Sequence, residues 1–512
     1  MATWFGAGSA TGDRVRAAMR PPDGDWSPPA TLSGDGAYHP SLAVAASGSA
    51  VVAWEQLDPA TEGFFIEAAV RKGGVWSSGA PLPKGTELHG AYFPRVAVNS
   101  TGDAVAVWQQ CYSTDYEACF TGQGNYLVRA SQRSAGGSWS APMTLSDETE
   151  DAIKLSPAVN AAGDLAVIWE DRKAAVINVA LRRAGASSWN AQQLSATGVA
   201  SGSAELGLAA DGTGIAVWDS FVEGNYRAAT SLLAAGSSTW SAPGFISQPG
   251  VNAFQPRLAL APSGEAVAVW ETIGGNLVQG AIRTGGTWGP ARNLSGEAAA
   301  EPHPSVAINP AGAMLAVWQG GPGAGSSIQG NHRPAGGDWL GAMSVPSSAG
   351  TEPAVAIDPQ GDGATVWRDP SASIQAALFE DAGTGLPGNP PTGSGAGGAT
   401  AASGSNGETT APEPKSQPGT ATLAGVAKVR NGKVLLRLRC GSPRPCAGFV
   451  KLVWHGKILG KATFQVPAQG SRTISIALRP SAKTALSTAG PDPITISAVG
   501  FSVKPRKLML KQ

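Results

Sequence analysis

Residues able to bind a ligand gather in two kinds of loop. The first is the segment 109–125, QQCYSTDYEACFTGQGN, in which two cysteines enclose aromatic and acidic side chains. The second is a set of short connections that each precede an apolar, strand-like run. Aromatic, imidazole, guanidinium and carboxylate groups that converge on one cavity can hold a polar ligand. The candidate ligand-binding residues are Tyr38, His39, Tyr92, Arg95, Tyr112, Asp115, Tyr116, Phe120, Phe254, Arg257, Glu301 and His303.

The cysteines fall into two local pairs, Cys111 with Cys119 and Cys440 with Cys446. Neither pair forms a CxxC motif or lies in a cluster with zinc-ligand spacing, so we expect two disulfides and no metal site; free buried thiols are the alternative. Disulfides are typical of secreted or cell-surface proteins. The opening residues MATWFG do not form a secretory signal peptide, and we expect the natural N-terminus to lie upstream. A cytoplasmic protein is the alternative.

A repeat of about 50 residues must position these loops. One signature is an apolar run that ends in tryptophan, as in AVAVW at Trp108 and Trp270. A second signature follows it, as in TWSAPGFIS at Trp240, and an apolar run, usually after proline, precedes it, as in PRVAV from residue 94. Each unit thus contains four short strands, here called A to D, joined by Gly- and Asn-rich turns.

Four short strands repeated at this period predict an all-β fold, a β-propeller of four-stranded blades over residues 1–385. We expect seven blades, with the strand Trp26–Leu32 completing the last blade and so closing the ring. That arrangement leaves the strand at Trp4 without a place. Eight or six blades are the alternatives.

The second signature resembles the Asp-box of sialidase-like propellers, which marks the turn between the third and fourth strands. Here it reads SAGGSW at Ser134–Trp139, RTGGTW at Arg283–Trp288 and PPDGDW at Pro21–Trp26. The box aspartate is mostly absent, with Asp23 the nearest survivor, and the Arg-Ile-Pro motif that supplies the first arginine of sialidases does not occur. The resemblance implies the propeller fold. No residue of this chain is assigned a catalytic role from it.

The repeated tryptophans are expected to pack each blade on its neighbour, because a residue that recurs in every unit belongs to the scaffold. The same holds for the acid or amide that follows the B-strand tryptophan, as in Glu55 and Gln109. Function is expected where one unit departs from the others. The interval from Trp108 to Trp139 is longer than in the other units because of the B–C loop 109–125, which shares a face with the D–A loops.

The remaining chain divides into a Gly-, Pro-, Ser- and Thr-rich linker, residues 386–419, and a strand-rich module, residues 420–512, for which we expect a small β-sandwich. The formal net charge of zero hides an asymmetry, since acids outnumber bases in residues 1–385 whereas Asp492 is the single acid in residues 420–512. The module resembles the basic C-terminal β-sandwich modules of secreted actinobacterial proteins. Its charge fits an anionic surface polymer, and no nucleic-acid-binding motif accompanies it.

The sequence therefore favours a non-enzymatic, secreted or cell-surface binding protein. The propeller would recognise a glycan or a partner protein, and the basic module would attach to an anionic surface. A sialidase-like glycoside hydrolase and a purely structural propeller are the alternatives. We expect a monomer without cofactor, and no apolar run in the sequence is long enough to cross a membrane.

Overall fold

The computed structural model describes residues 1–379 apart from residues 10–11, 22–24, 46, 60–62, 84–89, 114–117, 120–123, 275, 297–301, 321–326 and 372, and from residue 421 onward it describes strands. Contacts divide the chain into two units, Met1–Gly395 and Ala396–Gln512. The expected linker, residues 386–419, lies outside the described residues. No helix long and apolar enough to span a membrane occurs among the residues that are described.

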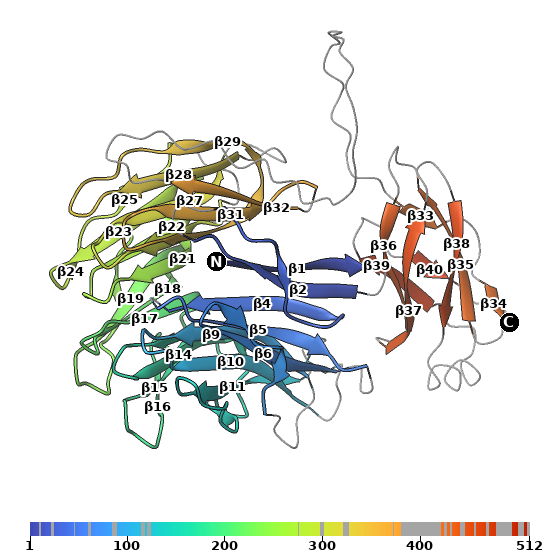
Figure 1. Ribbon diagram of the computed structural model, residues 1–512, viewed down its shortest axis with the longest axis horizontal. Coiled ribbons are helices and arrows are strands. Elements are labelled where there is room, and N and C mark those ends of the chain that lie inside the picture. Colours follow the sequence, from blue (N-terminus) through green and yellow to red (C-terminus); the bar gives the residue numbers. More distant parts are fainter. Residues whose placement is uncertain are drawn as a thin grey trace, which may run out of the picture. The chain divides into compact units, whose positions relative to one another are not determined.

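The described strands of the first unit form eight antiparallel sheets, numbered here as blades 1 to 8 in chain order (Figure 1). Blades 1 to 4 contain β1 (Ala2–Ser9), β2 (Gly12–Ala18) and β3 (Ala30–Thr31); β4 (Ala37–Val44), β5 (Ala50–Leu57), β6 (Phe64–Lys72), β7 (Val75–Trp76) and β8 (Ala80–Pro81); β9 (Ala91–Val98), β10 (Ala104–Tyr112), β11 (Asn125–Arg133) and β12 (Met143–Thr144); and β13 (Ala152–Val159), β14 (Leu165–Asp171), β15 (Val176–Arg182) and β16 (Asn190–Gln193).

Blades 5 to 8 repeat the same meander. They contain β17 (Ser201–Leu208), β18 (Gly214–Val222), β19 (Asn225–Leu233) and β20 (Gly244–Phe245); β21 (Asn252–Leu260), β22 (Ala266–Ile273), β23 (Val278–Thr284), β24 (Thr287–Trp288) and β25 (Arg292–Asn293); β26 (Ser305–Ile308), β27 (Met314–Gly320), β28 (Ser327–Arg333) and β29 (Met343–Ala349); and β30 (Thr351–Ile357), β31 (Gly363–Arg368) and β32 (Ile374–Phe379).

The predicted β-propeller is confirmed, but the preference for seven blades is wrong and the alternative of eight is right. The segment expected to complete the last blade instead stays in the first, where Ala30 and Thr31 pair with Ala17 and Arg16 of β2. The strand that holds Trp4 also pairs with β2. A local hairpin orders less chain than pairing with a strand at the far end of the sequence, so the N-terminal strands form a blade of their own.

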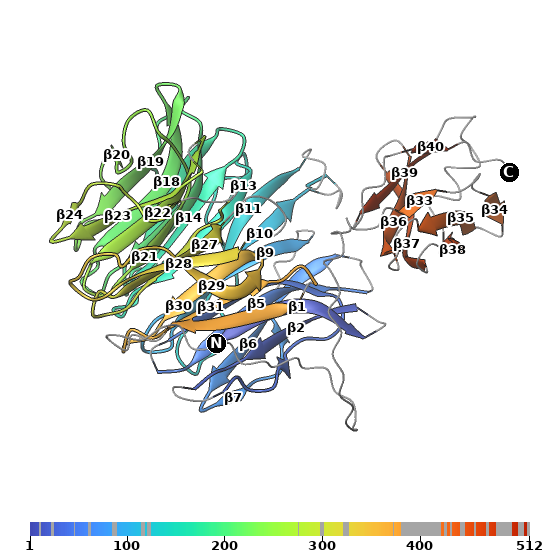
Figure 2. The same cartoon turned by 90° about the horizontal axis from the view of Figure 1, so that it is seen from above.

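From blade 2 to blade 8, each A strand lies at one edge of its sheet and successive A strands contact one another, so they line the centre of the ring. Figure 2 shows the same sheets from above. The B strands lie between neighbouring blades, so both of their faces are covered. For this reason they read as continuous apolar runs, and β5 and β10 are buried along almost their whole length. The D strands are short and mostly exposed at the rim.

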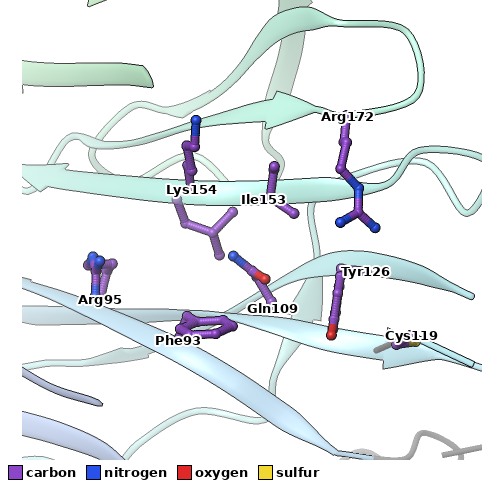
Figure 3. Close-up of a pocket in the computed structure, with 9 residues that line it drawn as sticks. Phe93, Arg95, Gln109, Cys119, Tyr126, Ile153, Lys154 and Arg172 are labelled. Carbon is purple, nitrogen blue, oxygen red and sulfur yellow. The ribbon is translucent and has the colours of Figure 1, made fainter. Parts of the chain in front are cut away.

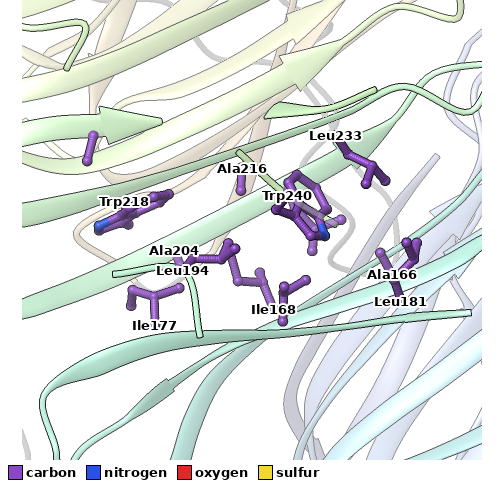
Figure 4. Packing of buried hydrophobic residues seen from close by; sticks show 13 residues of the cluster. Ala166, Ile168, Ile177, Leu181, Leu194, Ala204, Ala216, Trp218, Leu233 and Trp240 are labelled. Atoms are coloured by element: carbon purple, nitrogen blue, oxygen red, sulfur yellow. The ribbon is translucent and has the colours of Figure 1, made fainter. Parts of the chain in front are cut away.

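From blade 2 to blade 8, each B-strand tryptophan packs against the preceding blade, as predicted. Between blades 4 and 5, Trp218 lies against Ile177 and Leu194, and Trp240 of the second signature completes the same cluster (Figure 4). Equivalent clusters surround Trp54 and Trp270 at other interfaces. Trp218 and Trp270 are 0% exposed, so these rings serve as core and leave no face for a ligand.

The second unit contains two antiparallel sheets among its described strands. One is formed by β33 (Ala421–Leu423), β34 (Lys428–Arg430), β35 (Lys433–Cys440) and β38 (Ser471–Ala477), and the other by β36 (Cys446–Trp454), β37 (Lys457–Val466), β39 (Ile494–Val499) and β40 (Arg506–Leu508). The side chains of Cys440 and Cys446, for which a disulfide is predicted, lie outside what the structure describes.

Replacing Trp270 with alanine should lower the free energy of unfolding of the propeller by about 3–5 kcal/mol, because it removes a fully buried ring and leaves a cavity between blades 5 and 6. Thermal and denaturant unfolding of the full chain would measure the loss. The control is Val75→Ala, since Val75 is 71% exposed and its removal should change stability by less than about 0.5 kcal/mol. Equal effects of the two substitutions would contradict the assignment of these tryptophans to the scaffold.

Candidate functional site

A ring of residues in left-handed backbone conformation surrounds one mouth of the central channel, one from each blade that has an A strand. They are His39, Phe93, Lys154, Ser203, Gln255, His303 and Glu352, with φ between 43° and 56°. In most of these blades the pairing of strands A and B shifts register at this point. A non-glycine residue in this region costs about 1–2 kcal/mol, so the surrounding structure must hold it there.

A carboxylate or amide from the preceding blade holds several of these residues. The amide of Phe93 donates to Glu55 Oε1 at 2.7 Å, and that of Gln255 donates to Asp219 Oδ2 at 3.1 Å. The amide of Glu352 donates to the neutral Gln319 Oε1 at 2.9 Å. Each acceptor follows a B-strand tryptophan, so the repeated acid or amide is a structural residue, as the sequence predicts.

A pocket of about 340 Å³ opens beside this ring between blades 3 and 4 (Figure 3). Phe93 and Arg95 reach it from β9, and Gln109 from β10 points into it from below, while Lys154 lies on β13 above it. Cys119, Tyr126, Ile153, Leu155 and Arg172 complete the wall. Most of the wall therefore comes from the blade that departs most from the repeat and from its neighbour.

Three cationic side chains give the pocket its character. Lys154 Nζ lies 3.1 Å from Glu170 Oε2, and Arg172 binds Asp151 with an Nη2–Oδ2 distance of 2.6 Å. Arg95 differs from these two, because within the described part of the chain its guanidinium donates to the backbone carbonyl of Pro94 and to no carboxylate. Its charge thus faces the pocket without a paired anion.

The environment of Arg95 disfavours an uncompensated charge. Although water reaches its side chain in the channel, surrounding protein lowers the pKa of Arg95 by desolvation, and repulsion from Arg257 lowers it further. Glu205 and Glu55 act in the opposite direction. Arginine stays charged under all ordinary conditions, so a bound anion would relieve both costs.

The disulfide predicted between Cys111 and Cys119 is present and forms part of the pocket wall. Both sulfur-bearing residues are buried, and they pack with Tyr92 and Tyr126. Gly124 lies so close that an added Cβ would be 2.8 Å from Cys119 Sγ. A cross-link over so short a loop stabilises the folded state by about 2–3 kcal/mol, so this wall is held in one shape.

The predicted site residues divide into those at the pocket, those elsewhere at the channel mouth and those outside the described residues. Arg95 lines the pocket, and Tyr92 packs beside it. Tyr38 and His39 belong to an aromatic cluster that includes Tyr92, and Phe254 packs on Tyr226 farther around the ring. Arg257 binds Glu205, and Tyr112 donates to Glu148. His303 belongs to the left-handed ring. Asp115, Tyr116, Phe120 and Glu301 lie outside the description.

Sequence reasoning missed Lys154 and Arg172. Their blade has leucine at position 155, where most of its counterparts have proline, and so the repeat is weak there. Alignment of the repeats at this position would have placed Lys154 in the same phase as Phe93 and His39. Arg172 follows the B strand directly, at the start of a B–C turn, and only its position on the pocket face marks it.

Two carboxylates lie close together at the next blade interface. An added Cβ on Gly202 would be 3.0 Å from Glu170 Oε2 and 3.4 Å from Asp219 Oδ1. Burial raises the pKa of Asp219 to about 6. The hydrogen bond from the Gln255 amide and the charge of Lys154 both lower this pKa, but by less than burial raises it. Among the described residues, no group of three or more His, Cys, Asp or Glu side chains could hold a metal ion.

The chain resembles several solved structures at low identity. A Dyadobacter fermentans protein of unknown function is 15% identical with a TM-score of 0.39, and 58% of this chain covers 94% of that one. The Ruminococcus gnavus intramolecular trans-sialidase is 11% identical with a TM-score of 0.36, and the match covers 66% of this chain and 91% of that one. A PL25 ulvan lyase is 9% identical with a TM-score of 0.45, and the match covers 68% of this chain and 94% of that one.

No family model and no curated protein matches the chain. Sialidases are among the solved structures that the chain resembles. What the pocket does has to follow from its own residues.

Replacing Asp219 with asparagine should stabilise the propeller near neutral pH and flatten its pH dependence. Because the pKa of Asp219 is raised from 3.8 to about 6, the folded chain binds more protons than the unfolded chain between these values. Its contribution to the free energy of unfolding therefore falls as pH rises through that window. Asparagine keeps an acceptor for the Gln255 amide, as Gln319 does for Glu352.

The gain at pH 7 should reach up to about 3 kcal/mol, measured by denaturant unfolding at pH 4 and pH 7. The control is Asp338→Asn. The Asp338 side chain is 92% exposed, so this substitution should leave the pH profile unchanged. A loss of stability in Asp219→Asn at pH 7 would show that its charge is required.

Proposed function

We propose that the pocket between blades 3 and 4 binds an acidic saccharide, and that the propeller acts as a glycan-binding protein without catalysis. The observation that carries this proposal is Arg95, a cation without a carboxylate partner among the described residues, placed beside the exposed ring of Phe93. Carboxylate or sulfate groups match a guanidinium in charge and geometry.

The pocket's size and composition support a sugar over a larger or wholly apolar ligand. Its volume of about 340 Å³ lies at the small end of the range for ligand sites. Gln109 supplies a hydrogen-bonding group for hydroxyls, and Phe93 supplies an apolar face for ring C–H groups (Figure 3). The ligand would also meet a wall that the disulfide has already ordered, which lowers the entropic cost of binding.

A glycoside hydrolase is the second candidate, favoured by the proximity of Glu170 and Asp219. Glycosidases use a protonated carboxyl group and an ionised one on either side of the bond that is cleaved, and burial raises the pKa of Asp219 to about 6. Both residues, however, occupy the scaffold position after the B-strand tryptophan and accept backbone hydrogen bonds at the left-handed ring. For this reason we place binding ahead of hydrolysis.

The substitution Arg95→Ala should weaken the binding of galacturonic acid and of galactose 6-sulfate by about tenfold to a hundredfold, because it removes a charged hydrogen bond. Isothermal titration calorimetry of the full chain measures the affinity, which should also fall as salt is added. The control is Arg292→Ala, a 64% exposed cation on β25.

Two results would oppose this proposal. Equal affinity of the wild type and Arg95→Ala would show that the pocket does not bind the saccharide. Recovery of cleaved products from an acidic oligosaccharide, lost in Asp219→Asn, would favour the hydrolase.

For residues 420–512 we propose attachment to an anionic polymer at a cell surface, in keeping with a secreted protein. The support is their composition, with Asp492 as the single acid among many lysines and arginines. A chain ending at residue 419 should lose salt-sensitive retention on teichoic-acid-containing cell walls while it keeps the propeller's saccharide affinity. Unchanged retention of the shortened chain would reject this role.

A further inference from the structure

Beyond the pocket, the channel mouth carries a row of exposed rings from three successive blades. The row consists of Phe5 from β1, His39 from β4 and Phe93 from β9. Ring centroids are 5.6 Å apart between Phe5 and His39 and 4.9 Å apart between His39 and Phe93. Phe5 is 41% exposed, Phe93 39% and the His39 side chain 45%. We call these three residues the aromatic platform.

We propose that the ligand is an oligosaccharide whose acidic unit occupies the pocket and whose neighbouring, uncharged units lie on the aromatic platform. This inference rests on the proposed function, because it takes the acidic unit to be at Arg95. It adds the direction in which the chain runs, across blades 3, 2 and 1, and the chemical class of the units that follow.

A second, more deeply placed set of rings supports the platform from below. Tyr38 contacts Phe5 with centroids 5.9 Å apart, and Phe64 links Tyr38 to Tyr92 at 5.8 and 5.7 Å. Tyr92 contacts Phe93 at 6.5 Å. Because Tyr92 is 2% exposed, the platform rests on packed core, and little conformational freedom remains to be lost when a ligand binds.

The platform exists because one blade departs from the repeat. Phe5 follows Trp4 at the position where Glu55, Glu170 and Asp219 follow their own tryptophans. In those blades the acid binds the amide of the next left-handed residue. In blade 1 a phenyl ring takes its place and packs against His39, the left-handed residue of blade 2. An exposed aromatic side chain thus replaces a structural acceptor at the interface of blades 1 and 2.

One carboxylate fixes the other two platform residues. Glu55 Oε1 lies 2.9 Å from His39 Nδ1 and accepts the amide of Phe93 at 2.7 Å. Glu55 is 3% exposed, so the His39 ring and the Phe93 backbone are both held by one buried carboxylate. This arrangement sets the distance between them independently of any ligand.

Phe93 belongs to both the platform and the pocket, so the two surfaces are continuous. A saccharide with its acid at Arg95 therefore has its next unit over Phe93 and His39 and a further unit toward Phe5. Ring C–H faces of sugars pack well on aromatic rings. Arg95 and Lys154 lie on the pocket side of Phe93, so uncharged units fit the platform better than acidic ones.

The experiment compares chain lengths on the full-length protein. Glucuronic acid is compared with a disaccharide and a tetrasaccharide in which one terminal glucuronate is followed by one or three uncharged hexoses, and each is titrated by calorimetry. The wild type should bind the tetrasaccharide more tightly than glucuronic acid. Phe5→Ala and Phe5→Leu should each weaken tetrasaccharide binding by about five- to tenfold and leave glucuronic acid binding unchanged.

The matched control is Phe221→Ala, which removes a 44% exposed phenylalanine packed on Tyr226 in blade 5 and should alter no affinity. Phe5→Leu keeps an apolar side chain in place, so an unchanged melting temperature in that variant separates lost binding from lost folding. If all chain lengths bind equally while Arg95→Ala abolishes binding, the platform is rejected and the pocket stands. If no acidic saccharide binds to the wild type, both proposals fail.

Discussion

The propeller depends on hydrogen bonds that cross from one blade to the next at the channel mouth, which are present at several of the blade interfaces. An acid or amide after the B-strand tryptophan accepts the amide of a left-handed residue, as Glu55 does for Phe93 and Asp219 for Gln255. At this point the A strand leaves its regular pairing with strand B, so that amide needs another acceptor. Where proline follows, as at Pro94 and Pro256, the chain has no further donor to satisfy. The carboxylate of the neighbouring blade thus stabilises an otherwise unfavourable backbone conformation.

A second ring of hydrogen bonds joins the blades at the opposite end of the channel. Asn99 donates to the carbonyl of Asn160 at 3.0 Å, Asn160 to that of Ala209 at 3.1 Å, and Asn309 to that of Asp358 at 3.0 Å. Between the two rings, each buried tryptophan fills the space between two sheets. Polar contacts therefore set the angle between blades at both ends, and apolar packing sets their distance. The channel mouth inherits its rigidity from this arrangement.

The sequence carries most of the scaffold because the scaffold is repeated. Continuous apolar runs that end in tryptophan fix the B strands, and the acid or amide after each tryptophan reveals the structural acceptor. The blade count could not be read in the same way. Both ends of the repeat are incomplete, and whether Ala30 and Thr31 pair locally or with the last blade depends on loop entropy, which leaves no trace in the pattern.

The pocket was only partly predictable for a similar reason. Arg95 and the disulfide stand out because they occur in the unit that breaks the period. Lys154 occurs in a weak copy of the repeat. It lines the pocket only because the sheets of blades 3 and 4 lie next to each other in the folded chain. The exchange of an acid for Phe5 was visible in the sequence, but its meaning required the contact with His39.

In the left-handed ring, the groups that hold the backbone are different from the side chains that face the channel. The acceptor lies in the neighbouring blade and binds an amide, which every residue except proline possesses, so the fold places little demand on what that residue presents to the channel. The seven positions carry His, Phe, Lys, Ser, Gln, His and Glu. Such a circle of interchangeable positions on a fixed frame resembles the hypervariable loops of an antibody. New specificities could arise there by single substitutions, without a matching change in the frame.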